Sequence, residues 1–108
     1  MSHVLETYWT VNSSAQRVAK GAAYLDRNYP GWERKVDVAI LDITETDRCI
    51  CGQVISPEYG WAEVRMDVIQ WGETAADYGF ALPSDGDTWV SLIKERFNTG
   101  NLSDLVAS

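Results

Sequence analysis

The sequence predicts a mainly α-helical protein: one compact domain, residues 1–108, built as a bundle of about four short helices. Three observations predict this fold class. Apolar residues recur at intervals of three and four along several segments, as on the buried face of a helix. A chain of 108 residues suits a single hydrophobic core, and an apolar fraction of 45% with five tryptophans supplies the large side chains that such a core needs.

The first helix is predicted over residues 13–29. Ser13 and Gln16 stand three positions apart, in the pattern of a capping box, which marks a helix start. The apolar residues that follow recur at helical spacing: Ala15, Val18, Ala22 and Leu25. Residues 1–12 are expected to be extended or frayed, with a short β element favoured at residues 7–11, TYWTV.

Residues 30–43 fit two alternatives. A proline suits the first position of a helix, and a helix from Pro30 would align three apolar residues on one face: Trp32, Val36 and Ile40. Apolar residues also alternate from position 36 to position 40, which is typical of a strand. A short β element at residues 36–43, and with it a small α+β fold, is therefore the alternative.

Two further helices are predicted in the second half of the chain. In residues 61–71, apolar side chains recur at intervals of three, four and three: Trp61, Val64, Val68 and Trp71. Asp87 is expected to cap the last helix. Its apolar face carries Trp89, Val90, Ile93 and Phe97. Gly100 is expected past its end, and residues 102–106 are expected to form a short final turn.

The net charge of −7 is concentrated in the middle of the chain. Residues 1–36 hold five bases and three acids, residues 37–87 hold eleven acids and two bases, which gives −9, and the remaining residues balance. An acidic field of this size repels phosphate backbones and anionic lipid surfaces. It argues against direct nucleic-acid binding and against a membrane as partner, and it favours a basic partner or a solvated acidic face.

The first residues, MSHVLETYWTV, lack the charged and apolar regions of a signal peptide, and no apolar run approaches the ~18 residues that span a bilayer. We therefore expect a soluble protein of the cytoplasm. Thiols stay reduced in that compartment, and Cys49 and Cys51, one residue apart, would close a strained disulfide ring. Both are expected to be free thiols.

The residue types for metal binding and catalysis are scarce. Cys49, Cys51 and the single histidine, His3, fall short of four converging ligands, so no metal and no cofactor are expected. A Ser-His or Cys-His nucleophile needs a well-placed imidazole, which His3 near the terminus does not supply. We expect no catalytic residues and no enzymatic activity.

Two charged stretches have structural interpretations. SDGDT, residues 84–88, lacks the later bidentate Glu of a calcium loop and is interpreted as a turn that leads into a helix cap. Arg17, Lys20 and Arg27 lie along one side of the first helix. We interpret them as solvated charges or members of ion pairs within the domain, rather than as a nucleic-acid surface.

Several short motifs occur in order between residues 18 and 97: GAAYLD at 21–26, PGW at 30–32, CICGQV at 49–54, YGF at 78–80 and, towards the C-terminus, Trp89. This ordered set resembles a family of uncharacterised small proteins from bacteriophages that infect actinobacteria. In that family the middle motif looks like Cys-x-x-Cys, then an apolar residue or two, then Gly-Gln. Cys49 matches the second cysteine, Thr46 stands where the first would be, and Cys51 takes a place that is usually apolar.

Because the paired thiol is missing, the resemblance implies structural roles for the matching residues, with Gly52 in close packing and Gln53 as a buried amide bonded to backbone. The residues that it marks as structural are Gly21, Pro30, Gly31, Trp32, Cys49, Gly52, Gln53, Tyr78, Gly79 and Phe80. It supplies no catalytic residue and no established activity.

Together these observations predict a phage-type cytoplasmic protein that acts by binding a host protein, as a modulator or a counter-defence inhibitor. The acidic segment is the candidate surface, represented by Glu63 and Asp67 on the exposed side of the helix at 61–71. Two alternatives stay open: a binder of a nucleotide-like small ligand, with tryptophans and basic residues lining a pocket, and an acidic DNA mimic. The oligomeric state is not specified by the sequence.

Overall fold

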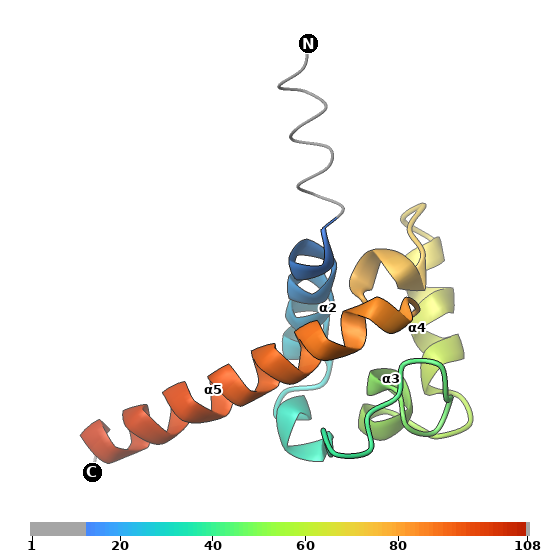
Figure 1. Cartoon of the computed structure of the whole chain (residues 1–108). Helices are drawn as coiled ribbons and strands as arrows, with labels where there is room; N and C mark the ends of the chain where they lie inside the picture. Colours follow the sequence, from blue (N-terminus) through green and yellow to red (C-terminus); the bar gives the residue numbers. More distant parts are fainter. Residues whose placement is uncertain (1–12, 108) are drawn as a thin grey trace.

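The computed structural model describes residues 13–107, with their side chains up to residue 98. Within these residues the chain forms four α-helices and three short 3-10 helices joined by turns, and no strand (Figure 1). The predicted mainly α fold class is confirmed. The alternative β element at residues 36–43 does not form, whereas the predictions for residues 1–12 lie outside the described residues.

Helix α2, Ser14–Asn28, begins where the sequence predicts. The Ser13 hydroxyl caps it by accepting a hydrogen bond from the backbone N–H of Gln16 at 3.2 Å. The buried face of the helix carries Val18, Gly21, Ala22, Tyr24 and Leu25. Ala15, one turn before Val18, is exposed, so the buried stripe starts one turn later than predicted.

Residues 30–48 form turns in place of the predicted second helix. Only Trp32–Lys35 are helical, as the 3-10 helix η1, and it follows Gly31 in the left-handed region at φ 81°. After η1 the Asp37 carboxylate accepts a hydrogen bond from the backbone N–H of Ala39 at 3.0 Å, and this local bond competes with a helical ladder. Ile40 is consequently 49% exposed instead of aligned on a buried face.

The short helix α3, Ile50–Val54, has no counterpart among the predicted helices. Its N-cap is Cys49, whose Sγ accepts a hydrogen bond from the backbone N–H of Gly52 at 3.3 Å. A thiol is a weak acceptor and is not among the side chains that usually cap helices. The local sequence therefore does not mark this helix start.

Helix α4, Gly60–Ile69, confirms the helix predicted at residues 61–71. Val64 and Val68 are fully buried, as their spacing predicts. Trp71 lies beyond the helix and is 53% exposed, so its predicted place on the buried face is wrong. The reason is a tight exit turn, in which the backbone N–H of Trp71 bonds the carbonyl of Val68, three residues back, and rotates the indole off that face.

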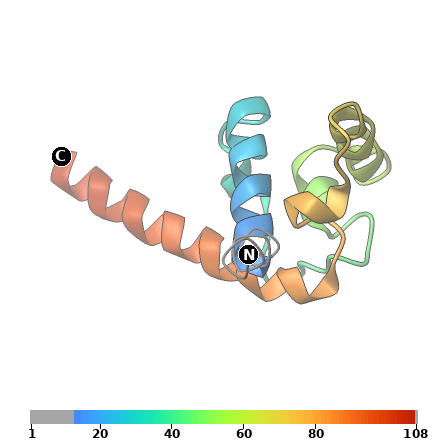
Figure 2. The ribbon, with the colours of Figure 1, turned by 90° about the horizontal axis from the view of Figure 1, so that it is seen from above.

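Helix α5, Gly86–Ala107, follows directly on the 3-10 helix η3, Pro83–Asp85. Asp87 thus lies in its first turn and is not its cap, contrary to the prediction. The helix also continues through Gly100, where the sequence predicts its end, because one glycine costs a helix only about 1 kcal/mol. Figures 1 and 2 show α5 crossing α2, with its C-terminal part extending away from the other helices.

The core is centred on Trp89 of α5, which is fully buried. Its indole N–H donates a hydrogen bond to the backbone carbonyl of Gly79 at 2.6 Å. The ring stacks on Phe80 and meets Trp32 edge to face, with 5.6 Å between ring centroids in both pairs. These contacts join α5 to η1 and to the turn that follows the 3-10 helix η2, Ala75–Tyr78.

Gly21 allows α2 to approach this cluster closely. A Cβ at this position would lie 2.0 Å from the carbonyl oxygen of Tyr78 and 2.9 Å from the ring of Trp89. Both distances are shorter than van der Waals contact, so the backbone of η2 packs directly against the backbone of α2. The structural role that the sequence assigns to Gly21 is therefore to let the backbones of α2 and η2 touch, with no side chain between them.

Asp85 is fully buried and ties η3 to α2. Its carboxylate accepts two hydrogen bonds from the Arg17 guanidinium, at 2.7 and 2.8 Å, and one from the Ser14 hydroxyl at 2.6 Å. Burial opposes ionisation, but these bonds and the charge of Arg17 together outweigh it and lower the pKa of Asp85. SDGDT is therefore helical, with its first two residues in η3 and the rest in α5, and not the predicted turn, and its Asp85 carboxylate is bound by α2.

The first prediction concerns the close approach at Gly21. We expect Gly21→Ala to lower the free energy of unfolding by about 1–3 kcal/mol, because the added methyl group meets a backbone carbonyl that cannot move aside alone. Urea denaturation measures the effect. Gly86→Ala is the matched control, since a Cβ there meets only Ile43 at 3.6 Å, an ordinary contact. Equal stability of the two variants would contradict the packing described here.

The second prediction concerns Asp85. We expect Asp85→Asn to lower the free energy of unfolding at neutral pH by about 1.5–3 kcal/mol, because a charged acceptor is lost from a buried network. Since folding lowers the pKa of Asp85 below its usual 3.8, the wild-type advantage is complete above that pH and disappears as the pH falls through the folded-state pKa.

Urea denaturation of both proteins from neutral to acidic pH checks this expectation. Asp87→Asn is the control, because it removes an exposed charge two residues further on. Parallel curves for wild type and Asp85→Asn over the acidic range would show that ionisation of Asp85 does not stabilise the fold.

Candidate functional site

Helix α4 is apolar on two opposite faces. Val64 and Val68 fill its inner face in the core. On the outer face Met66 is 71% exposed and Ile69 is 56% exposed. A surface helix normally carries polar residues opposite its core stripe, so this second apolar face is not explained by the fold.

The outer residues form a row along the helix, which we name the α4 stripe: Tyr59, Ala62, Met66 and Ile69. Their spacing of three, four and three places them on one side of a helix that begins directly after Tyr59. Tyr59 is 63% exposed, and Trp71, just beyond the helix, adds another exposed ring. A contiguous exposed apolar row of this kind is typical of a surface that contacts another molecule.

The two acidic residues predicted as the site differ in their surroundings. Glu63 is exposed, one residue after Ala62 of the α4 stripe. Asp67 is half-buried, and its carboxylate accepts hydrogen bonds from the Tyr24 hydroxyl at 2.6 Å and the Gln70 amide at 2.8 Å. Burial and, second, the bond to Asp67 raise the pKa of Tyr24. Only Glu63 is therefore a free surface carboxylate, whereas Asp67 fastens α4 to α2.

Two hollows lie beside α4 and share Trp61 and Ala81, and together we name them the Trp61 groove. The first, of about 380 Å³, is lined by Ile43, Thr44, Thr46, Cys49, Trp61, Phe80 and Ala81. The second, of about 280 Å³, is lined by Trp61, Arg65, Ile69, Glu73, Thr74, Ala75, Ala76 and Ala81. Because Ile69 also belongs to the α4 stripe, groove and stripe form one continuous surface.

Arg65 lies over the ring of Trp61, with 5.6 Å from the guanidinium carbon to the ring centroid. Both residues line the second hollow, and so does Glu73. Glu73 in turn pairs with Lys20 and accepts a hydrogen bond from the Tyr78 hydroxyl. The second hollow thus has an aromatic wall and balanced charge at its edge.

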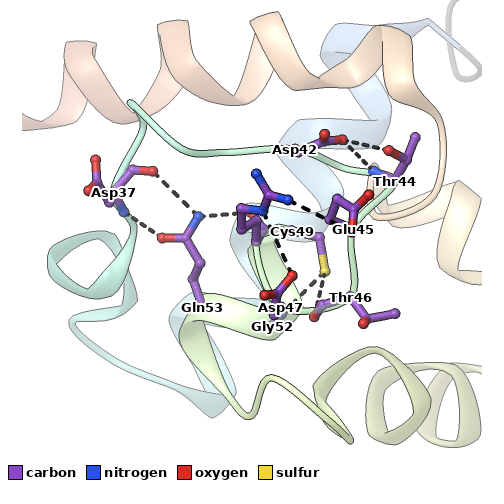
Figure 3. A network of polar contacts seen from close by, with 10 residues as sticks. Asp37, Asp42, Thr44, Glu45, Thr46, Asp47, Cys49, Gly52 and Gln53 are labelled. Atoms are coloured by element: carbon purple, nitrogen blue, oxygen red, sulfur yellow. Dashed lines mark hydrogen bonds and ion pairs between the residues drawn. The ribbon is translucent and has the colours of Figure 1, made fainter.

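An acidic loop, residues 37–48, contributes Ile43, Thr44 and Thr46 to the wall of the first hollow. Figure 3 shows the polar contacts of this loop. The Gln53 amide holds its two ends, accepting from the Asp37 N–H at 2.6 Å and donating to the Arg48 carbonyl at 2.8 Å. Gln53 thus bonds to backbone, as the sequence predicts, although it is half-buried rather than buried. The loop is thus held at both ends, and three of its four acidic residues, Asp37, Glu45 and Asp47, are exposed.

The cysteine pair is structural in this arrangement. Cys49 and Cys51 are free and buried, and burial is the main cause that raises the pKa of both thiols. A thiol held protonated is a poor nucleophile and a poor metal ligand. Within the described part of the chain, no three His, Cys, Asp or Glu side chains are grouped so that they could hold a metal ion.

Most of the residues that the sequence marks as structural come together in two places. Around Trp89 lie Gly21, Trp32, Tyr78, Gly79 and Phe80, all buried. At the acidic loop, Cys49 caps α3, Gln53 bonds the loop, and a Cβ on Gly52 would lie 2.0 Å from the carbonyl oxygen of Thr46. Pro30 and Gly31 are exposed in the turn after α2.

Basic residues of α2 form ion pairs within the domain, one of the two interpretations that the sequence left open. Arg17 pairs with Asp85 and Lys20 pairs with Glu73, while Arg27 is exposed. Because two of these bases contact carboxylates of the same chain, they do not form a free basic stripe for nucleic acid.

Sequence reasoning missed the α4 stripe and the Trp61 groove. The stripe had a visible signal, since Met66 and Ile69 lie off the row formed by Trp61, Val64 and Val68. A segment with apolar residues on both faces predicts either a fully buried helix or a contact surface. The groove had no such signal, because its walls come from segments that are far apart in the sequence.

Comparison of the chain with protein-family models, with curated proteins and with solved structures gives no match in any of the three. Among the described residues, no helix has both the length and the apolar character that crossing a bilayer requires. Inferences about function therefore rest on the sequence and the geometry of this chain.

The third prediction separates the two acidic residues of α4. We expect Asp67→Ala to lower the free energy of unfolding by about 1–3 kcal/mol, because the buried Tyr24 hydroxyl loses its acceptor. The matched variant Glu63→Ala, on the exposed side, should change it by less than about 0.5 kcal/mol. Chemical denaturation of both variants is the measurement. If Asp67→Ala is as stable as Glu63→Ala, Asp67 does not fasten α4 to α2.

Proposed function

We propose that this protein acts by binding another protein and that the α4 stripe is the contact surface. One observation carries the proposal: Met66 and Ile69 are 71% and 56% exposed on a helix whose opposite face already packs in the core. Fully burying a side chain of this size stabilises a complex by about 1.5–3 kcal/mol relative to leaving it in water. A partner surface that covers the stripe would gain this free energy.

The charge of the surroundings indicates the partner's chemistry. Glu63 borders the stripe, and residues 37–87, which include α4, carry a net charge of −9. A partner with an apolar patch and a basic rim complements such a surface, and opposite charges accelerate association. Two copies of this acidic segment would repel each other, so a different protein is the better match.

The biological setting that we propose follows from the resemblance to small actinobacteriophage proteins. In that setting the chain acts in the host cytoplasm and its partner is a host protein, whose activity it modulates or blocks. This role needs binding and no catalysis. It also accounts for the exposed apolar row. Neither a DNA mimic nor a nucleotide binder would need such a row, because both depend on charge at the contact.

The fourth prediction tests this function by position-specific crosslinking in an actinobacterial host. The photoreactive amino acid p-benzoylphenylalanine replaces Met66 in one variant and Glu95, an exposed residue of α5, in another. We expect a discrete heavier adduct after irradiation of the first variant and none from the second. Adding Ile69→Glu to the first variant should remove most of the adduct, because a charge would then sit within the apolar contact.

Denaturing gels and mass spectrometry identify the adducts, and thermal unfolding checks that Ile69→Glu leaves the fold intact. Absence of any adduct from position 66 would overturn the proposal. Equal adducts from positions 66 and 95 would also overturn it, because they would show contact without a defined surface.

A further inference from the structure

The first hollow of the Trp61 groove is suited to an apolar side chain. Its walls include Ile43, Phe80 and the ring of Trp61, and the buried Cys49 thiol lies among them. A space of about 380 Å³ is large enough for one bulky aliphatic or aromatic group. The groove lies open beside the helix rather than enclosed in the core, since Trp61 and Ala81 are both half-buried.

Exposed carboxylates lie in the loop that lines this hollow. Thr44 and Thr46 line it, and Glu45 and Asp47 each follow one of them directly in the chain, in the loop that Figure 3 shows. The side chains of Glu45 and Asp47 are 50% and 62% exposed. The Arg48 guanidinium lies 4.0 Å from the Glu45 carboxylate and 3.9 Å from the Asp47 carboxylate. Ion pairs of this length between exposed groups are weak, so both carboxylates stay accessible.

In this loop the two carboxylates of Glu45 and Asp47 exceed the single positive charge of Arg48. This excess of negative charge decides among possible occupants of the hollow. A nucleotide-like anion would meet Glu45 and Asp47 unfavourably. A second copy of this chain would bring another acidic surface to the same place. A segment that pairs an apolar side chain with lysine or arginine complements both the apolar walls and the acidic loop.

We infer that the Trp61 groove receives a basic, apolar-anchored segment of the partner protein, which places a bulky side chain in the first hollow and its lysines or arginines against Glu45 and Asp47. The inference rests on the proposed function and names the chemistry of the partner. Continuity through Ile69 lets the same partner cover the α4 stripe.

The fifth prediction uses a defined probe: a fluorescently labelled short peptide in which leucine and phenylalanine alternate with lysine. A second peptide has glutamate in place of every lysine. We expect the lysine peptide to bind the full chain at least about tenfold more tightly than the glutamate peptide, as measured by fluorescence anisotropy. High salt should weaken this preference, because the carboxylates are exposed.

Two variants of the chain test whether the peptide binds in the groove. Ala81→Trp adds a bulky ring at a residue that lines both hollows and should weaken binding of the lysine peptide at least about tenfold. The matched control is Ala39→Trp, which adds the same side chain at an exposed position in the acidic loop and should leave affinity unchanged.

A charge swap keeps the test decisive if Ala81→Trp does not fold. The double variant Glu45→Lys with Asp47→Lys alters only exposed side chains and should reverse the preference between the two peptides. Equal binding of both peptides by the wild-type chain, no binding of either, or a preference that the swap leaves unchanged would each overturn the inference. So would a concentration-dependent dimer that Ala81→Trp abolishes, because a second copy would then be the occupant.

The crosslinking experiment distinguishes failure of this inference from failure of the proposed function. If Ala81→Trp folds and leaves the adduct at position 66 unchanged, the partner contacts the α4 stripe without entering the groove, and only the inference is overturned. If the adduct at position 66 is absent while the lysine peptide binds as expected, the groove inference holds for its probe and the proposed use of the stripe fails.

Discussion

The hydrogen bond from the Trp89 indole to the Gly79 carbonyl, in a fully buried setting, is the constraint on which the rest of the structure depends. A buried indole N–H without an acceptor costs about 1–3 kcal/mol, so the turn after η2 must present its carbonyl to α5. That turn then places Phe80 against the indole and the carbonyl of Tyr78 against Gly21. Helix α2, η2 and α5 are therefore positioned relative to one another by one aromatic ring.

Ion pairs around this core engage basic side chains that would otherwise be solvated. Arg17 binds Asp85, and Arg96 of α5 binds Asp26 and Glu33 on the far side of Trp32. The acidic loop holds four carboxylates against one base, Arg48, and α4 holds two against Arg65, so negative charge remains in excess beside the Trp61 groove and the α4 stripe. The same contacts that close the core thus leave an acidic surface on one part of the molecule.

Helix α4 is rigidly supported at this surface. Val64 and Val68 fix its inner face, and Asp67 bonds the Tyr24 hydroxyl of α2. A helix that is already fixed loses little conformational freedom when a partner covers its outer face, which favours binding. The stripe and the groove depend on the core in this way, although neither is required for the core to form.

Local patterns in the sequence were enough to determine the mainly α class, the Ser13 start of α2 and the burial of Val64 and Val68, because each depends on residues three or four positions apart. Tertiary structure alone decided that Asp85 is buried against Arg17, that Asp67 serves Tyr24, and that Trp61 and Ala81 share a groove. Cys49 as a helix cap also depended on a backbone turn that no preferred residue marks. For Asp85, Asp67 and the groove, the physical reason is that the contacts join segments separated by many residues, and their geometry exists only once Trp89 has brought the helices together.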